Sequence, residues 1–225
     1  MKLLLAQSKS DVLAISESWL NSTIPDSYLS IVNYQLYRKD RTDKSGGGVA
    51  LYVSQKYTHS LSKLDTETGT LQLSINFTPQ HAITVIVTYK PPNVSASRYL
   101  SQLSDIIKPV TTKELVIMGD INLDWNDAVS KPLKTIAIKL GLYQLIKDST
   151  RIGQTRRSIL YLIFTNHPAK YALSGVIDRD GGTRVKDLTR VRLESPVLRL
   201  VTCLTNTNER LDLTLTCPFL TCDLT

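Results

Sequence analysis

Residues 115–125 read Leu-Val-Ile-Met-Gly-Asp-Ile-Asn-Leu-Asp-Trp. The continuous apolar run 115–118 predicts a strand buried on both faces. Gly119 ends the run, and Asp120 and Asn122 follow at the carboxyl end of the strand, where open α/β sheets bind ligands. Strand alternation predicts that the two side chains lie on the same side, where an acid and an amide can orient a water and hold a phosphoryl oxygen. Both residues are also turn formers that end strands, and that alternative stays open here.

Short apolar segments on either side of this stretch predict further strands and two helices. Strands are expected at residues 11–15, 49–53, 71–77, 83–89 and 160–164. Apolar residues at helical spacing predict a helix over 96–107, and Pro132 opens a second one that ends near Gly141. Strands interspersed with helices indicate a layered α/β or α+β domain.

The composition excludes two classes of protein. The chain has 225 residues, of which 42% are hydrophobic and 21% charged, so it is neither a disordered tail nor a membrane bundle. The apolar start, residues 1–7, is shorter than a signal peptide needs and predicts a first helix or strand of the fold. We therefore expect an intracellular protein with no membrane partner. No feature indicates an obligate protein partner.

The net charge and the spacing of cysteines and histidines indicate which ligands the chain could bind. The net charge of +7 is compatible with a polyanion such as nucleic acid, although many proteins share it. The three cysteines (Cys203, Cys217 and Cys222) are an odd number without a signal sequence, which argues against a disulfide framework. No histidine lies among them, which argues against a zinc site. The three histidines (His59, His81 and His167) lie at no spacing typical of a nucleophile or metal site.

Three other segments carry candidate site residues. Glu17 follows the strand predicted at 11–15 and is a candidate Mg²⁺ ligand, or else a glutamate that starts a helix. Tyr89 and Lys90 end the strand at 83–89 and offer a phenol and a cation to a phosphate, or else form a plain strand exit before Pro91-Pro92. Arg38 and Arg41 precede Gly46-Gly47-Gly48 and are candidate contacts to a nucleic-acid backbone, or else part of a solvated loop.

The order of these segments carries more information than each one alone. Glu-Ser-Trp-Leu from 17, Tyr-Arg-Lys-Asp-Arg from 37, Tyr-Lys-Pro-Pro-Asn from 89 and Met-Gly-Asp-Ile-Asn from 118 resemble the endonuclease/exonuclease/phosphatase superfamily. Within it, they are most similar to the apurinic-type endonuclease domain of LINE-type, non-LTR retrotransposons. The resemblance extends to about residue 177, so we expect a domain at 1–177 and a divergent segment at 178–225.

The resemblance implies a two-sheet α/β sandwich with helices on the outer faces and a site at one end of the sheets. It implies hydrolysis of DNA phosphodiesters with Mg²⁺ or Mn²⁺, and a nuclear location. Glu17 matches the family's metal-binding glutamate and Tyr89 its phosphate-contacting tyrosine. Asp120 matches the aspartate that acts on the attacking water, and Asn122 matches the asparagine that supports it.

Departures from the family pattern predict an impaired enzyme, incomplete at both ends. Tyr161 occupies the position of an expected aspartate. No histidine follows Ile177, where the family has a Ser-Asp-His motif. The family's first strand precedes the position of Met1, so we expect an exposed sheet edge or a core gap beside residues 11–15. The alternatives are a non-catalytic nucleic-acid-binding remnant and a phosphatase of the same superfamily.

Overall fold

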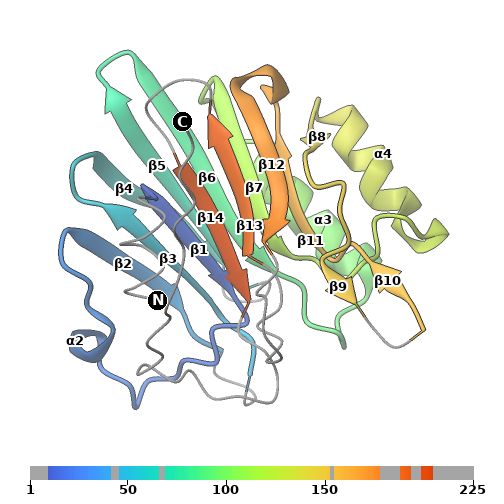
Figure 1. Cartoon of the computed structure of the whole chain (residues 1–225), viewed down its shortest axis with the longest axis horizontal. Helices are drawn as coiled ribbons and strands as arrows, with labels where there is room; N and C mark the ends of the chain where they lie inside the picture. The colour runs from blue at the N-terminus through green and yellow to red at the C-terminus, as the bar shows by residue number, and fades with distance from the viewer. Residues whose placement is uncertain are drawn as a thin grey trace.

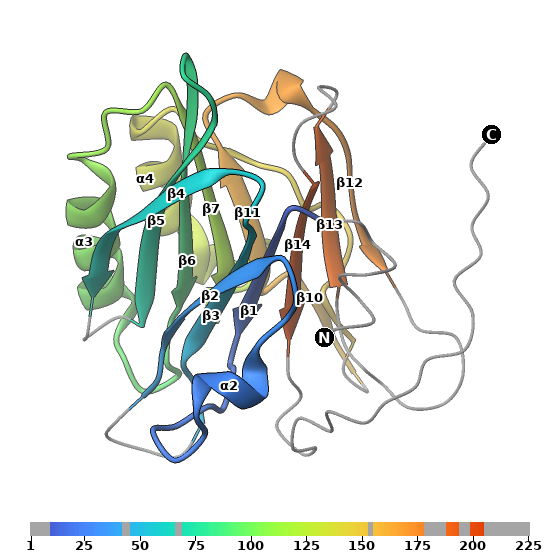
Figure 2. The same ribbon diagram turned by 90° about the vertical axis from the view of Figure 1, so that its left-hand side faces the viewer.

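The computed structural model describes residues 10–41, 46–65, 69–152, 155–177, 188–193 and 199–204. Two six-stranded sheets face each other (Figures 1 and 2), and a short two-stranded sheet lies at one end. Helices α3 and α4 cover the outer face of the second sheet (Figure 2). The predicted α/β sandwich with outer helices is therefore confirmed.

The first sheet has the strand order β12-β13-β14-β1-β3-β2. Its strands are β1 (Val12–Ser16), β2 (Tyr34–Lys39), β3 (Val49–Ser54), β12 (Tyr171–Ile177), β13 (Leu188–Leu193) and β14 (Arg199–Leu204). Strand β14 pairs in parallel with β1, and β3 pairs with its other side. Strand β1 is therefore not an exposed edge, one of the two outcomes expected, because β14 from the C-terminal segment pairs with it. The core gap, the other outcome, stays a prediction. The boundary predicted at residue 177 stays a prediction.

The second sheet brings two predicted site residues to the same end. Its order is β4-β5-β6-β7-β11-β8, with β4 (Thr58–Asp65), β5 (Thr70–Thr78), β6 (His81–Tyr89), β7 (Glu114–Asp120), β8 (Tyr143–Gln144) and β11 (Tyr161–Thr165). Strands β6 and β7 are parallel, and Tyr89 lies opposite Asp120 in their register. Strand β11 is antiparallel to β7 and places Tyr161 opposite Asp120 on its other side.

The helices follow the predicted spacing. Helix α3 (Ala96–Ile107) begins after Ser95, whose side chain accepts the Arg98 N–H at 3.3 Å, and it buries a single apolar face. Helix α4 (Lys131–Lys139) has proline in its first turn. The other short elements are α2 (Asp26–Leu29), η1 (Ala128–Ser130), η2 (Pro168–Lys170), β9 (Arg151–Ile152) and β10 (Arg157–Ser158).

The main core lies between the two sheets because alternate residues of β1 and β3 face inward. Val12 and Ala14 join a cluster that includes both faces of β6 and β7 and the apolar sides of α3 and α4. Leu13 and Ile15 point the other way and pack with Leu29 of α2. Both faces of β1 are therefore buried, which fixes the position of its carboxyl end.

Some predicted features lie outside the described residues. These are the element expected at residues 1–7, Cys217, Cys222 and most of the divergent segment expected at 178–225. None of the helices in the described ranges is long and apolar enough to cross a bilayer.

Candidate active site

The carboxyl ends of β1, β6 and β7 meet at the same end of the two sheets. The hydroxyl of Tyr89, at the end of β6, donates to Glu17 Oε1 at 2.8 Å, although the two residues are 72 positions apart. The Asp120 N–H, at the end of β7, donates to Ser16 Oγ across the two sheets at 3.2 Å. The tertiary structure therefore brings Glu17, Tyr89 and Asp120 together.

Asp120 is the most enclosed acid of this group, with 4% of its surface exposed. Its Oδ1 accepts the Asn122 N–H at 2.9 Å and its Oδ2 accepts the Tyr161 hydroxyl at 3.0 Å. Burial is the largest influence and, with the charge of Glu17, raises the pKa of Asp120 to about 7, although these hydrogen bonds and the charge of Arg151 act in the opposite direction. Asp120 can therefore exchange a proton near neutral pH.

Asn122 reaches the site by a turn and not by strand alternation. Strand β7 ends at Asp120, and Asn122 has a φ of 50°, a left-handed conformation that asparagine tolerates better than most residues. Its Nδ2 donates to the Lys90 carbonyl at 2.9 Å, and the Lys90 N–H donates to the Asp120 carbonyl at 2.8 Å. These bonds lock Asn122 between the ends of β6 and β7.

Glu17 belongs to a strained loop and not to a helix, so the helix-start alternative does not apply. Glu17 and Trp19 both have a φ of 55°, a conformation that costs free energy and clusters at functional sites. The N–H groups of Ser18 and Trp19 donate to the carbonyls of Gly48 and Gly47 at 3.1 and 2.9 Å. The glycine loop thus holds the Glu17 loop in place.

Gly47 permits a close contact with the site. It has a φ of 81°, and a Cβ atom there would lie 2.9 Å from Tyr89 Cε1 and 3.1 Å from Arg41 Cδ. Only a residue without a side chain fits this position. The glycine run therefore packs against the site and is not merely a solvated loop.

Two of the three predicted cations lie at the site. Burial lowers the pKa of Lys90, and the charge of Asp120 partly offsets this effect. Arg41 lies close enough to Tyr89 for its charge to influence the pKa of that phenol, which burial and Glu17 raise well above its usual range.

The third predicted cation, Arg38, is not brought to this group. Its Nε pairs with Asp26 Oδ1 at 2.9 Å and one terminal nitrogen donates to the Ile24 carbonyl at 2.8 Å, while the same nitrogen lies 3.6 Å from Asp40 Oδ2. Its partner in the β2–β3 pair, Ala50, belongs to the apolar cluster that also contains Leu13, Ile15 and Leu29. Arg38 therefore fastens the segment around α2 to the sheet.

Sequence reasoning missed Arg151. Its charge lowers the pKa of both Glu17 and Asp120, and it lines the same cavity as Asn122. Thr150-Arg151 falls within the stretch that resembles the family, but the two-residue strand β9 shows no pattern that assigns Arg151 to the site.

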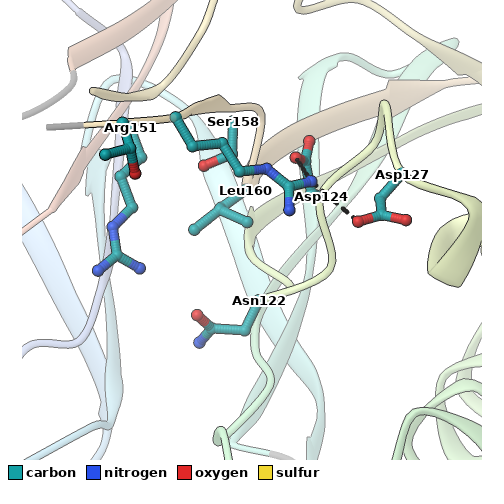
Figure 3. A pocket seen from close by; sticks show the side chains of 8 residues that line it. Asn122, Asp124, Asp127, Arg151, Ser158 and Leu160 are labelled. Atoms are coloured by element: carbon teal, nitrogen blue, oxygen red, sulfur yellow. Dashed lines mark hydrogen bonds and ion pairs between the residues drawn. The ribbon is translucent and has the colours of Figure 1, made fainter. Parts of the chain in front are cut away.

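A cavity of about 380 Å³ opens beside Asn122 (Figure 3). Arg151 lies on one side of it, and Asp124 and Asp127 lie on the other (Figure 3). The terminal nitrogen of Arg156 contacts Asp124 at 2.7 Å and Asp127 at 2.8 Å. The lining residues are Asn122, Asp124, Asp127, Arg151, Thr155, Arg156, Ser158 and Leu160. The candidate site therefore borders an open space lined by Arg151 and by an Arg156–Asp124–Asp127 ion-pair cluster.

The carboxylates fit a hard divalent cation that takes few protein ligands. Burial raises the pKa of Glu17, and the charge of Glu17 raises the pKa of Asp120, so a bound cation would relieve charge repulsion between the two acids. Within the described ranges, no cluster of three or more His, Cys, Asp or Glu side chains could hold a metal ion. This donor set is typical of Mg²⁺, which is held by one or two carboxylates, waters and substrate phosphates.

Comparisons with known proteins identify the family and the fold of the chain. The model of the endonuclease/exonuclease/phosphatase family matches residues 2–218. The endonuclease domain of TRAS1, a telomere-specific non-LTR retrotransposon, has a TM-score of 0.67 at 18% identity, covering 85% of this chain and 90% of that one. An endonuclease/exonuclease/phosphatase family protein from Leptotrichia buccalis has a TM-score of 0.62 at 16% identity, covering 84% and 89%.

The AP endonuclease LMAP from Leishmania major has a TM-score of 0.62 at 11% identity, covering 78% of this chain and 76% of that one. A search of curated proteins found no match. At these identities the solved structures establish the fold, and the family model establishes membership. The chain belongs to the endonuclease/exonuclease/phosphatase family.

Proposed function

We propose that this chain is a DNA endonuclease domain of retroelement type that hydrolyses phosphodiesters with Mg²⁺ or Mn²⁺, at a reduced rate. The observation that carries the proposal is the meeting of Glu17, Tyr89 and Asp120 from three strand ends in two sheets. A phosphodiester needs an activated water and neutralisation of charge on its oxygens. This group offers both.

Each residue has a role that follows from its surroundings. Asp120, with a pKa of about 7, accepts the proton of the attacking water. Tyr89 keeps its proton, because burial raises its pKa. Its hydroxyl, which donates to Glu17 Oε1 in this structure, would turn to a phosphate oxygen when the substrate binds. Asn122 and Arg151 line the adjoining cavity and orient the phosphate. Glu17 would hold the divalent cation, which neutralises charge on the phosphate when bound.

Two observations support a reduced rate. The first is that the three histidines make their hydrogen bonds away from Glu17, Tyr89 and Asp120: His59 contacts Tyr37, His81 contacts Glu114, and His167 contacts the Lys113 carbonyl. Loss of a general acid or base costs about 10²- to 10⁴-fold in rate.

The second observation is that the Tyr161 hydroxyl donates a hydrogen bond to Asp120 Oδ2. That hydrogen bond stabilises the ionised carboxylate and makes it a weaker base. The water-activating group is therefore present but less reactive.

Nicking of supercoiled plasmid DNA with Mg²⁺ tests the proposal. We expect slow nicking that EDTA abolishes and that Asp120→Ala removes. Asp105→Ala is the matched control, because the Asp105 carboxylate is 64% exposed and pairs only locally with Lys108. Metal-dependent nicking at an equal rate in Asp120→Ala would contradict the proposed role of this site.

A non-catalytic nucleic-acid-binding domain is the second candidate. The Tyr161–Asp120 hydrogen bond and the net charge of +7 favour it. Binding whose affinity falls steeply with salt, without any cleavage, would identify this function.

A further inference from the structure

Trp19 is a large aromatic residue held in place without being buried. It is 41% exposed and lies two residues after Glu17. Its N–H donates to the Gly47 carbonyl at 2.9 Å. The backbone of Gly46 lies against its ring, since a Cβ there would be 3.1 Å from Trp19 Cζ2.

The other tryptophan shows what a structural role looks like in this fold. Trp125 packs edge-to-face against Phe164 with ring centroids 5.6 Å apart, and the Lys134 ammonium lies 5.2 Å from its ring centroid. Trp125 belongs to the apolar residues packed against the main core, whereas Trp19 belongs to neither apolar cluster in the described part of the chain. Burial in a core therefore does not explain Trp19.

Trp19 borders the candidate active site through two consecutive glycines. Gly46 lies against the Trp19 ring, and Gly47 lies against the Tyr89 ring and the Arg41 side chain. An aromatic face, a cation and a phenol hydroxyl are thus arranged along one loop beside Glu17. Nucleotides present the matching groups, because each has a base with a π-face next to a charged phosphate.

We infer that Trp19 is a stacking platform for the base of an unpaired nucleotide next to the phosphate that Tyr89 contacts. This inference rests on the proposed function, since it takes DNA as the ligand. Stacking accepts any base, because every base has a π-face. The platform therefore favours sites where the duplex is frayed, distorted or single-stranded, and it adds no base-specific hydrogen bonds.

Fluorescence and binding measurements test the inference on the full chain. In the Trp125→Phe variant, Trp19 is the remaining tryptophan of two, and we expect oligothymidylate in EDTA to quench its emission. Anisotropy of a labelled oligothymidylate measures affinity. We expect Trp19→Ala to weaken binding about 5- to 150-fold, the range for loss of one stacked base, and Trp19→Phe to retain most of it.

Tyr143→Ala is the matched control. Tyr143 is an aromatic residue that is 57% exposed, and it lies at the opposite end of the second sheet, where β8 pairs with Thr165. We expect this variant to bind as the wild type does. Unchanged binding by Trp19→Ala, or emission that DNA does not alter, would overturn the inference. Equal losses in Trp19→Phe and Trp19→Ala with lowered melting temperatures would also overturn it, because they indicate a scaffold role.

The two proposals fail in different ways. If the protein does not nick DNA, but DNA quenches Trp19 emission and Trp19→Ala weakens DNA binding, the hydrolytic function is removed and stacking is supported. If the protein nicks DNA with metal, and wild type and Trp19→Ala have equal DNA affinity and KM, the stacking inference is overturned and the proposed nuclease function stands. If Trp19→Ala alters sedimentation of the free protein but not DNA binding, the ring covers a protein surface and the inference is overturned.

Discussion

Replacing Asp120 by asparagine should stabilise the fold while it disables the site. The carboxyl group is buried, and its pKa rises from 3.8 to about 7. At 1.36 kcal/mol per pKa unit, ionisation of Asp120 costs the folded protein about 4 kcal/mol at alkaline pH. The amide carries no charge and keeps an oxygen for the Asn122 N–H, so Asp120→Asn avoids this cost.

The pH dependence has a definite sign. Between about pH 4 and about pH 7, the folded protein retains the Asp120 proton that the unfolded chain releases. Because the folded state binds more protons in this window, the contribution of Asp120 to the free energy of unfolding falls as the pH rises. The stability gained by Asp120→Asn therefore grows over the same window and levels off above it.

Urea denaturation of both proteins in EDTA measures this gain, since EDTA removes cations that would offset the carboxylate charge. We expect Asp120→Asn to be more stable by about 2 kcal/mol near pH 5 and by about 4 kcal/mol near pH 8. Asp105→Asn is the control, and its exposed ion pair with Lys108 predicts a change below about 1 kcal/mol at both pH values. An Asp120→Asn protein no more stable than wild type near pH 8 would refute the argument.

Two further predictions concern packing around and away from the site. Gly47→Ala should lower the free energy of unfolding by about 1–3 kcal/mol and slow nicking, because the new Cβ would lie 2.9 Å from the Tyr89 ring. Gly141 has a similar positive φ, but a Cβ there would have nothing within 4 Å. Gly141→Ala should therefore lower the free energy of unfolding by only about 1 kcal/mol in urea denaturation. Equal losses of stability in both variants would contradict the contact argument. Glu114→Gln should cost about 2 kcal/mol, because Glu114 is 1% exposed and accepts from Lys170 at 2.5 Å. Thermal melts check that loss, and unchanged nicking per folded molecule confirms that the ion pair lies outside the site.

The local patterns of the sequence determined many secondary-structure elements. Apolar runs predicted β1, β3, β5, β6, β7 and β11, and helical spacing predicted both bounds of α3. These features depend on near neighbours, because side-chain periodicity and a capping residue act within a few positions. Strands β2 and β4 were missed, since their sequences mix polar and apolar residues along partly exposed strands.

The sequence also predicted that Glu17, Tyr89, Asp120 and Asn122 belong to one site, through the order of motifs that resembles a family. It did not determine how they meet. The Tyr89–Glu17 hydrogen bond and the β6–β7 register join segments far apart in the chain, and such pairings depend on which surfaces pack together.

Only the tertiary structure assigned the cations. Arg38 and Arg41 are three positions apart in one basic segment, yet Arg38 is bound by Asp26 while Arg41 lies beside Gly47 and Tyr89. Arg151 lies in a strand too short to show a pattern, yet its charge lowers the pKa of both site carboxylates. The physical reason is that a cation's role depends on the acids that the fold brings within a few ångströms, and composition does not specify those distances.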